Sequence, residues 1–408
     1  MATKANHRMM REVNRSIVLD LIRSAGPISR TEVARQTSLA KPTVSDIVDG
    51  LMVEGTVREI GFGDTTKQGG RPPSLVEFNE RSCAYLGIDF GVHTTNVAVA
   101  DGLGQIVSTA SAGSVRHDPR GAVEQVVQLA KGALTESSFS MGQLEAVAAT
   151  VAGVVDRDTG DLVLAPNLDW ADFPLGEALA TEFDRPVSVH NVTHAAAIAE
   201  GAEGAAAGVG EFVWVYIGTG VGAGIVIDGQ LFTGRQGYAG ELGHCPVVDN
   251  GPQCACGRRG CLETVASAPA IVRAAERARG KRRRTVLRDI PPGQLDAAAV
   301  AAAARDGDRV ALDVLADVGE HLGRGIAYLL NILNPDLVVI GGAVAGAGDV
   351  LLDPVRRSVA NHALDATRTE IVGSALGSRA ELIGAVRLAI VNRPSSHRIV
   401  TRGFAPGA

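Results

Sequence analysis

Apolar residues at helical spacing, separated by tight turns, mark the beginning of the chain. Residues 13–24 place apolar side chains on one face of a predicted helix, and a Gly-Pro turn follows. The segment from Ser29 to Glu32 has the sequence of a capping box, in which the serine hydroxyl and the glutamate carboxylate bind free amides at a helix start. The second predicted helix therefore begins here and ends near Thr37.

A third helix is predicted from Lys41, with Pro42 in its first turn, where proline is well tolerated. Its apolar stripe consists of Val44, Ile47, Val48, Leu51 and Met52. Short helices joined by a tight turn predict a helix-turn-helix, whose last helix enters the DNA major groove. The candidate DNA contacts on this helix are Lys41, Pro42, Thr43 and Ser45.

A wing is predicted after these helices, from a short strand over residues 57–60 and a glycine-rich segment over 61–73. Arg71 lies between glycines and prolines that keep the backbone thin, so it is a candidate for the minor groove. Residues 1–45 contain 8 Lys or Arg and 3 Asp or Glu, although the chain has a net charge of −6. This distribution favours local DNA binding. The alternative is a three-helix module for protein interaction or dimerisation.

From Tyr85 onward, strand-like apolar runs alternate with Ala-rich helical segments, which predicts an α/β fold. Residues 85–101 and 213–229 resemble each other, since each places a glycine turn between two apolar strands. Such a duplication is expected of an actin-like, ribonuclease-H-like fold with two lobes. Glycine turns allow close approach of a phosphate to backbone amides, but most of them are simply tight turns.

Cysteines are concentrated in one short segment. His244 and the run CACGRRGC offer an imidazole and thiolates for a closed tetrahedral zinc site, with the ligands His244, Cys254, Cys256 and Cys261. The alternative is a set of buried free thiols. Cys245 is interpreted as a bystander and Cys83 as a small core residue.

Size and composition limit the class of protein. A chain of 408 residues with 46% hydrophobic and 21% charged residues is expected to form two or three globular domains. We find neither an apolar run long enough for a membrane span nor the apolar region of a secretory signal. The clustered cysteines suit a metal site in a reducing compartment, so a cytoplasmic protein without membrane contact is expected.

Residues 83–391 resemble the ROK family (repressors, open reading frames and kinases). The resemblance rests on the zinc-loop pattern GHxxV…CxCGxxGCxE and on the segments VAGVVD, LAPNLDW and INILNPDLVVIGGAV. Residues 1–80 resemble the winged helix-turn-helix of ROK regulators. The resemblance implies a multi-domain protein with a two-lobed ROK sugar-kinase fold, a zinc loop over 244–261 and a disordered tail over 392–408.

The resemblance also implies a sugar site. In the family, a histidine both binds zinc and lies beside the sugar, and glutamates on either side of the loop bind sugar hydroxyls. The sugar contacts implied here are Gly153, Asn167, Asn191, Glu241, His244 and Glu263.

Two departures from the family pattern concern catalysis. Kinases of the family carry Asn-Asp-x-Asn, whose aspartate takes the proton of the attacking sugar hydroxyl. This chain matches at Asn191 but has Val192 at the aspartate and His194 at the last asparagine. Loss of a positioned base costs a factor of about 100 to 10,000. The first phosphate turn of the family has the pattern Asp-x-Gly-x-Thr, which corresponds to residues 89–93 here. This turn is also altered, because His93 replaces the threonine, whereas the turn over 218–222 is intact.

Together these features predict a sugar-responsive transcriptional regulator with a catalytically inactive kinase-like domain. It is expected to bind a roughly palindromic operator as a homodimer or homotetramer, and to act more as a repressor than as an activator. The competing hypothesis is an ATP-dependent carbohydrate kinase with an accessory DNA-binding domain. A third is a DNA-binding scaffold that ignores sugars.

Overall fold

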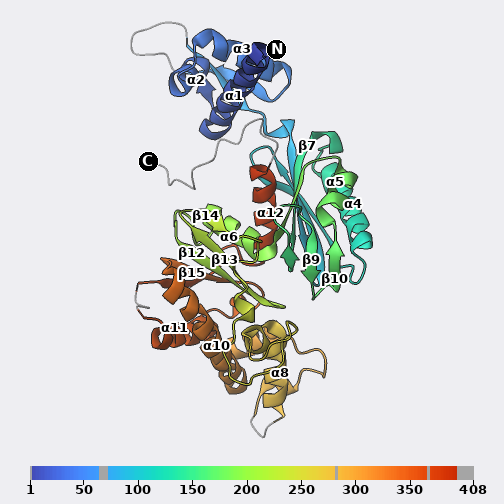
Figure 1. Ribbon diagram of the computed structural model, residues 1–408, viewed down its shortest axis with the longest axis vertical. Helices are drawn as coiled ribbons and strands as arrows, with labels where there is room; N and C mark the ends of the chain where they lie inside the picture. Colours follow the sequence, from blue (N-terminus) through green and yellow to red (C-terminus); the bar gives the residue numbers. More distant parts are fainter. Residues whose placement is uncertain (1, 64–71, 281–283, 365–367, 393–408) are drawn as a thin grey trace.

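The computed structural model describes residues 2–63, 72–280, 284–364 and 368–392. Figure 1 shows a small helical unit at one end, followed by two larger lobes, each built around a β-sheet. Within the described ranges, no helix has the length and apolar character needed to cross a membrane.

The N-terminal unit is a winged helix-turn-helix. Its elements are α1 (Ala2–Ala25), β1 (Ile28–Ser29), α2 (Arg30–Thr37), α3 (Lys41–Val53), β2 (Val57–Phe62) and β3 (Ser74–Phe78). The strands form a sheet in the order β1-β3-β2. Val18, Val48 and Val76 are buried in its core, which continues through Phe78 into the first lobe at Tyr85.

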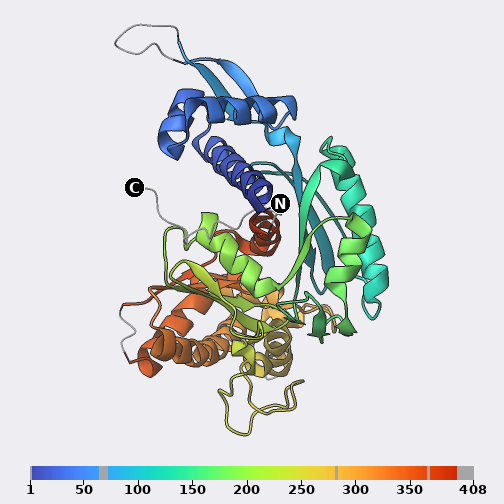
Figure 2. The same cartoon turned by 45° about the horizontal axis from the view of Figure 1, so that its top comes forward.

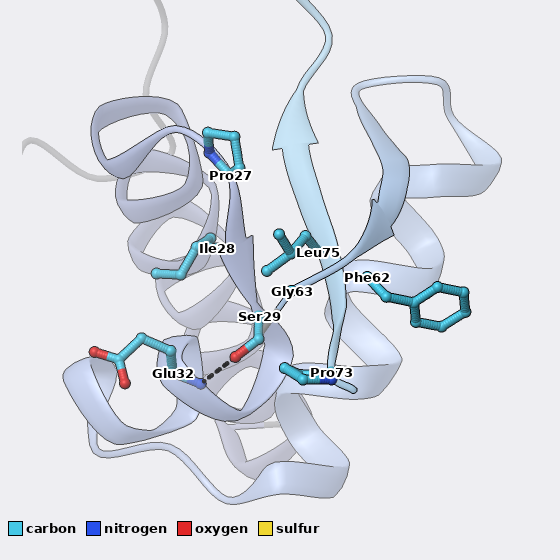
Figure 3. Close-up of a pocket in the computed structure, with 8 residues that line it drawn as sticks. All are labelled: Pro27, Ile28, Ser29, Glu32, Phe62, Gly63, Pro73 and Leu75. Atoms are coloured by element: carbon cyan, nitrogen blue, oxygen red, sulfur yellow. Dashed lines mark hydrogen bonds between the residues drawn. The ribbon is translucent and has the colours of Figure 1, made fainter. Parts of the chain in front are cut away.

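Two details of this unit differ from the sequence prediction. Helix α1 begins at Ala2, well before residue 13, because residues 2–12 contain no glycine or proline that would interrupt a helix. Only the serine half of the capping box forms: Ser29 Oγ accepts a hydrogen bond from Glu32 N at 3.2 Å (Figure 3). The Glu32 carboxylate instead binds Arg35 Nε at 2.8 Å and Gln36 Nε2 at 2.7 Å.

The first lobe contains a mixed five-stranded sheet in the order β11-β7-β4-β5-β6. Its strands are β4 (Ala84–Phe90), β5 (Thr94–Asp101), β6 (Ile106–Gly113), β7 (Leu144–Val151) and β11 (Val187–Asn191). One face packs on α4 (Pro119–Glu136) and α5 (Leu175–Phe183). A small sheet beside it consists of β8 (Val154–Val155), β9 (Leu162–Ala165) and β10 (Trp170–Phe173).

The second lobe repeats this strand order as β14-β13-β12-β15-β16. Its strands are β12 (Phe212–Ile217), β13 (Val221–Ile227), β14 (Gln230–Phe232), β15 (Leu337–Gly341) and β16 (Glu370–Gly373). Its helices are α7 (Glu263–Ala266), α8 (Ala268–Arg279), α9 (Ala297–Arg305), α10 (Arg309–Leu333) and α11 (Asp349–His362). The β4–β5 and β12–β13 hairpins are the two similar segments of the sequence, so the predicted two-lobed actin-like fold is confirmed.

Two helices lie between the sheets, α6 (Val192–Glu203) and α12 (Ala380–Val391) (Figure 2). Their contact is unusually close, because a Cβ on Gly384 of α12 would overlap the carbonyl of Ala195 in α6. On its other side α6 meets β13, where a Cβ on Gly224 would overlap the carbonyl of Thr193. Helix α6 is therefore packed backbone against backbone on both sides.

We predict that Gly384→Ala lowers the stability of the protein by about 1–3 kcal/mol, because the added methyl group must displace α6 from α12. The measurement is the midpoint of urea unfolding, followed by circular dichroism. Gly132→Ala on α4 is the matched control, since nothing lies within 4 Å of its Cβ position. This control should gain up to about 1 kcal/mol, as alanine favours a helix. Equal midpoints for the two variants would contradict the close α6–α12 contact.

Candidate functional site

A cavity of about 200 Å³ lies between the two lobes. Segments of the first lobe form one wall. The β12–β13 turn and the segment over 240–263, which contains the clustered cysteines, form the other. All the residues predicted as sugar contacts line this cavity, namely Gly153, Asn167, Asn191, Glu241, His244 and Glu263. The structure thus brings together residues that are far apart in the sequence.

In the first lobe, Gly153 follows β7 and Asn167 follows β9. A Cβ on Gly153 would lie 2.5 Å from Leu164 O, so the approach of β9 already requires a glycine at this position. Packing of the small sheet therefore accounts for this residue whether or not a ligand is present.

Asn191 has a structural role that the sequence comparison did not indicate. It is the N-cap of α6, where its Oδ1 accepts hydrogen bonds from Thr193 N at 2.8 Å and Thr193 Oγ1 at 2.7 Å. Its Nδ2 donates to Gly153 O at 2.9 Å. The side chain joins the start of α6 to the segment after β7, and one amide hydrogen remains for another acceptor.

In the second lobe, acidic and imidazole groups meet in the cavity wall. Glu241 Oε2 lies 3.7 Å from His244 Nε2. The pKa of Glu241 is raised, mainly by burial. The nearby His244 acts in the opposite direction, and the carboxylate of Glu263 adds to the rise. Glu263 Oε2 accepts a hydrogen bond from Val221 N at 3.3 Å, which fixes it to the glycine-rich turn. Carboxylates held in this way can accept hydrogen bonds from sugar hydroxyls.

The other side of His244 faces the cysteines. The potential ligand atoms of His244, Cys254, Cys256 and Cys261 all lie within 4.8 Å of one another. Cys254 Sγ is 3.6 Å from His244 Nδ1, and Cys256 Sγ is 3.7 Å from Cys261 Sγ. A tetrahedron with metal–sulfur bonds of about 2.3 Å and metal–nitrogen bonds of about 2.0 Å has edges of about 3.5 to 3.8 Å. The arrangement therefore fits a tetrahedral metal ion.

The chemistry of the thiols also fits a metal ion. Burial raises the pKa of Cys254, and it raises the pKa of Cys261 to about 12. Without a cation these thiols stay protonated at neutral pH, and a bound divalent ion supplies the charge that stabilises thiolates. Cys245 is not part of the group, and Cys83 is buried in the core, as both were interpreted from the sequence.

Val192, at the position of the kinase aspartate, lines the cavity and is 8% exposed. His194 is buried, its Nε2 lies 3.4 Å from Ala239 O, and burial lowers its pKa. In the first phosphate turn Asp89 is buried and accepts hydrogen bonds from Asn96 Nδ2 at 3.2 Å and Thr150 Oγ1 at 3.0 Å. Burial raises the pKa of Asp89, and His93 is exposed.

The start of α3 presents the predicted DNA contacts. Lys41 and Pro42 are exposed, whereas Thr43 and Ser45 are half-buried. Arg71 and the predicted tail beyond Asn392 lie outside the described residues. A shallow hollow beside the wing, lined by residues that include Pro27, Phe62 and Leu75, separates the start of α2 from the strands β2 and β3 (Figure 3).

Several cavity residues were not singled out from the sequence. Leu164 and Pro166 belong to the segment before Asn167, Thr219 lies in the glycine-rich turn, and Ala255 lies between two metal-site cysteines. Each is adjacent to a recognised motif, so proximity in the chain was the available signal. Leu164, Pro166 and Ala255 carry no polar side-chain group that would have marked them, and the hydroxyl of Thr219 is too common a group to do so alone.

The family model described as ROK family matches residues 85–392. The chain belongs to the ROK family. A putative xylose repressor from Caldicellulosiruptor sp. (strain Rt8B.4) is 33% identical, over 94% of this chain and 97% of that protein.

Two solved ROK structures show how the matches are distributed. A ROK family transcriptional regulator, a homologue of the E. coli MLC protein, superposes with a TM-score of 0.78 at 27% identity and covers 94% of this chain and 97% of its own. A ROK glucokinase from Streptomyces griseus, in complex with glucose and AMPPNP, has a TM-score of 0.68 at 32% identity. It covers 75% of this chain and 99% of its own. The regulator thus matches this ROK protein nearly from end to end.

We predict that Cys261→Ala abolishes binding of a transition metal by the purified protein, because a buried ligand of the site is lost. Metal content per chain, measured by elemental analysis, is the test. Cys245→Ala is the matched control, because this residue adjoins His244 but lies outside the ligand group, and it should keep its metal. Full metal content in the Cys261 variant would rule out this ligand set.

Proposed function

We propose that this protein is a sugar-responsive DNA-binding transcriptional repressor whose kinase-like domain binds a sugar without phosphorylating it. The observation that carries the proposal is the composition of the cavity: carboxylates and amides suited to sugar hydroxyls surround it, but Val192 occupies the place of the proton acceptor. The winged helix-turn-helix in the same chain supports a regulatory output, as do the relative named a putative xylose repressor and the solved ROK transcriptional regulator.

The proposed sugar contacts are the six cavity residues Gly153, Asn167, Asn191, Glu241, His244 and Glu263. A dry site with fixed hydrogen-bonding groups discriminates between sugars, because a mismatched hydroxyl pattern leaves buried polar groups unpaired. Asn191 would contribute its one remaining amide hydrogen, whereas the carboxylates would accept hydrogen bonds.

We assign the metal as a structural zinc ion held by His244, Cys254, Cys256 and Cys261. Ala255 and Cys256 of this loop line the cavity, so the metal would hold part of the sugar-binding wall in place. The ion would also orient His244, whose Nε2 faces Glu241.

The DNA-binding part would act through Lys41, Pro42, Thr43 and Ser45 in the major groove and Arg71 in the minor groove. Two winged helices in a homodimer or homotetramer would read a roughly palindromic operator.

A route for coupling runs through α6 and α12. The first residues of α6 line the cavity, and α6 packs on α12. Leu388 and Ala389 of α12 belong to the same apolar cluster as Tyr85 and Phe78, where the first lobe meets the winged helix. Sugar binding would change lobe closure and thereby the position of the DNA-binding units. A coupling free energy of about 1–3 kcal/mol changes operator affinity about 5- to 150-fold.

The second candidate is a carbohydrate kinase, which the match to the glucokinase favours. Val192 argues against it, because this side chain cannot accept the proton of an attacking sugar hydroxyl.

We predict that Glu241→Gln weakens the sugar response of operator binding about 10-fold or more, because an amide replaces a carboxylate acceptor. Affinity for the operator without sugar should stay unchanged, since Glu241 lines the cavity between the two lobes, whereas α3 belongs to the N-terminal unit. The measurement is fluorescence anisotropy of a labelled operator titrated with and without sugar. Metal content must match the wild type, because Glu241 adjoins His244.

Lys41→Ala should have the opposite effects. We expect weaker operator binding with a smaller salt dependence, because a phosphate-neutralising charge is lost. The heat of sugar binding should stay as in the wild type. If both variants lost both activities together, the division of labour between the two parts of the chain would be wrong.

We also predict no sugar phosphate above background when the wild-type protein is incubated with Mg-ATP and a panel of hexoses, pentoses and amino sugars. A coupled assay of ATP turnover is suitable. Turnover of about 1 per second, which is within the ordinary range for enzymes, would establish the kinase instead.

A further inference from the structure

A strongly basic surface lies on the second lobe, and neither the sugar cavity nor the winged helix-turn-helix uses it. Residues 273–288, which comprise the second half of α8 and the segment after it, contain 8 Lys or Arg and one Glu. The whole chain has a net charge of −6, so the rest of it is strongly acidic. Residues 281–283 lie outside the described ranges and are not part of the surface considered below.

The described part of this segment is fastened to the end of α8. Arg279 pairs with Glu276 at 2.7 Å. Its Nη1 donates to Leu287 O at 3.0 Å and to Ile290 O at 2.8 Å. In return, Arg288 Nε donates to Arg279 O at 2.8 Å. The arginines of α8 and those of the following segment therefore lie on the same part of the lobe.

Three exposed arginines have no carboxylate partner within the described ranges, namely Arg273, Arg277 and Arg284. Arg273 and Arg277 are one turn apart on the outer face of α8, about 6 Å along its axis. Arg273 Nη2 donates to the backbone oxygen of Thr264 at 3.1 Å, which leaves its charge unneutralised.

Two nearby carboxylates do not neutralise this surface. Asp308 lies beside Thr285, the residue after Arg284, but its Oδ1 accepts from Thr285 Oγ1 at 3.0 Å and its Oδ2 from Val286 N at 2.9 Å. Asp289 is exposed, and among the described residues no ion pair joins it to the three arginines. The surface therefore presents guanidinium groups that can bind an anionic partner.

The composition of the surface favours the phosphate backbone of duplex DNA over a protein. Protein interfaces have an apolar and often aromatic centre, but Val286 is the only large apolar side chain that is exposed among the described residues between 268 and 290. The same segment contains no aromatic residue on which the bases of a single strand could stack. Arginines without an apolar centre suit phosphates, whose binding depends on charge and not on base sequence.

We propose that Arg273, Arg277 and Arg284 form a second DNA-binding surface, which holds the phosphate backbone of a duplex independently of its sequence. Helix α8 and the helices α1–α3 lie at opposite ends of the molecule (Figure 1). A duplex held at α8 is therefore a different DNA segment from the one at the winged helix, and the protein bridges the two. The bridging rests on the DNA binding by the winged helix proposed above, whereas phosphate binding at α8 does not.

The first test measures phosphate binding at α8 in the full-length protein with its metal. The probe is a labelled duplex of about 30 base pairs and random sequence, followed by fluorescence anisotropy at several salt concentrations. All proteins carry Lys41→Ala, so that the winged helix contributes less. Adding Arg277→Ala/Arg284→Ala should lower the affinity about 10-fold and reduce the slope of log affinity against log salt by about 0.9 for each lost contact. Arg273 is retained, because it also binds the backbone.

The matched control is Arg120→Ala/Arg357→Ala, which removes the same charge from exposed positions on α4 and α11. It should leave both quantities unchanged. Equal affinities of the two double variants would overturn the proposal, because net charge alone would then explain the binding.

A competition experiment separates DNA from an acidic protein. Poly-L-glutamate carries at most one charge per 3.3 Å or so, whereas a duplex carries one per about 1.7 Å. At equal total charge it should compete about 10-fold less well than unlabelled duplex. Equal competition would overturn the assignment to DNA and indicate an acidic protein partner.

Bridging is tested by capture. Beads with an immobilised duplex are loaded with protein that has the native Lys41, and a second, labelled duplex is added. The captured label should fall to background with Arg277→Ala/Arg284→Ala and stay at the wild-type level with the control variant. Full capture by the arginine variant would contradict the bridging role. If Lys41→Ala changed no DNA binding while the arginine variant did, the proposed role of the winged helix would be wrong and the surface on α8 would stand.

Discussion

Helix α6 is held by contacts too close to allow it to move alone. Its backbone at Ala195 meets Gly384 of α12, and its backbone at Thr193 meets Gly224 of β13. Its buried Glu200 accepts hydrogen bonds from Ala205 N at 2.6 Å and from Leu376 N, just before α12, at 3.2 Å. Close-packed interiors transmit displacement and do not absorb it. A shift at the cavity end of α6 must therefore involve α12 as well.

The cavity is lined on one side by the start of helix α6 and on the other by a loop with few buried apolar residues. The loop that carries Cys254 and Cys256 contains mostly exposed residues between 252 and 259, so it has little apolar core of its own. A tetrahedral metal ion would supply the stability that burial does not. In the proposed function, a sugar bound by Glu241 and Glu263 on one side and by Asn167 and Asn191 on the other would link the two lobes.

The features predicted correctly from the sequence depend on local patterns. The apolar stripe of α3, each of the two similar hairpins and the cysteine spacing can be recognised within a few tens of residues. The ROK motifs then identified residues that line the cavity. Other features depend on contacts between distant segments. From the sequence alone, Asn191 can be interpreted as a sugar ligand or as a helix cap. Only its hydrogen bonds with Thr193 and Gly153 show that it caps α6. Likewise, Glu32 has a basic partner one turn away in Arg35, so the second half of the capping box does not form.

In the function proposed above, Val192 in place of a carboxylate would have a consequence beyond the loss of a reaction. A protein that phosphorylated its sugar would convert the ligand into a product, and the occupancy of its site would depend on ATP as well as on sugar. Reversible binding at a site without a proton acceptor makes occupancy depend on sugar concentration alone, which is what a regulator has to measure. Val192 is also the first residue of α6 and lines the cavity. In the proposed function, a sugar in the cavity would therefore contact the start of the helix that cannot move alone, so that recognition and transmission would occur in a single turn of this helix.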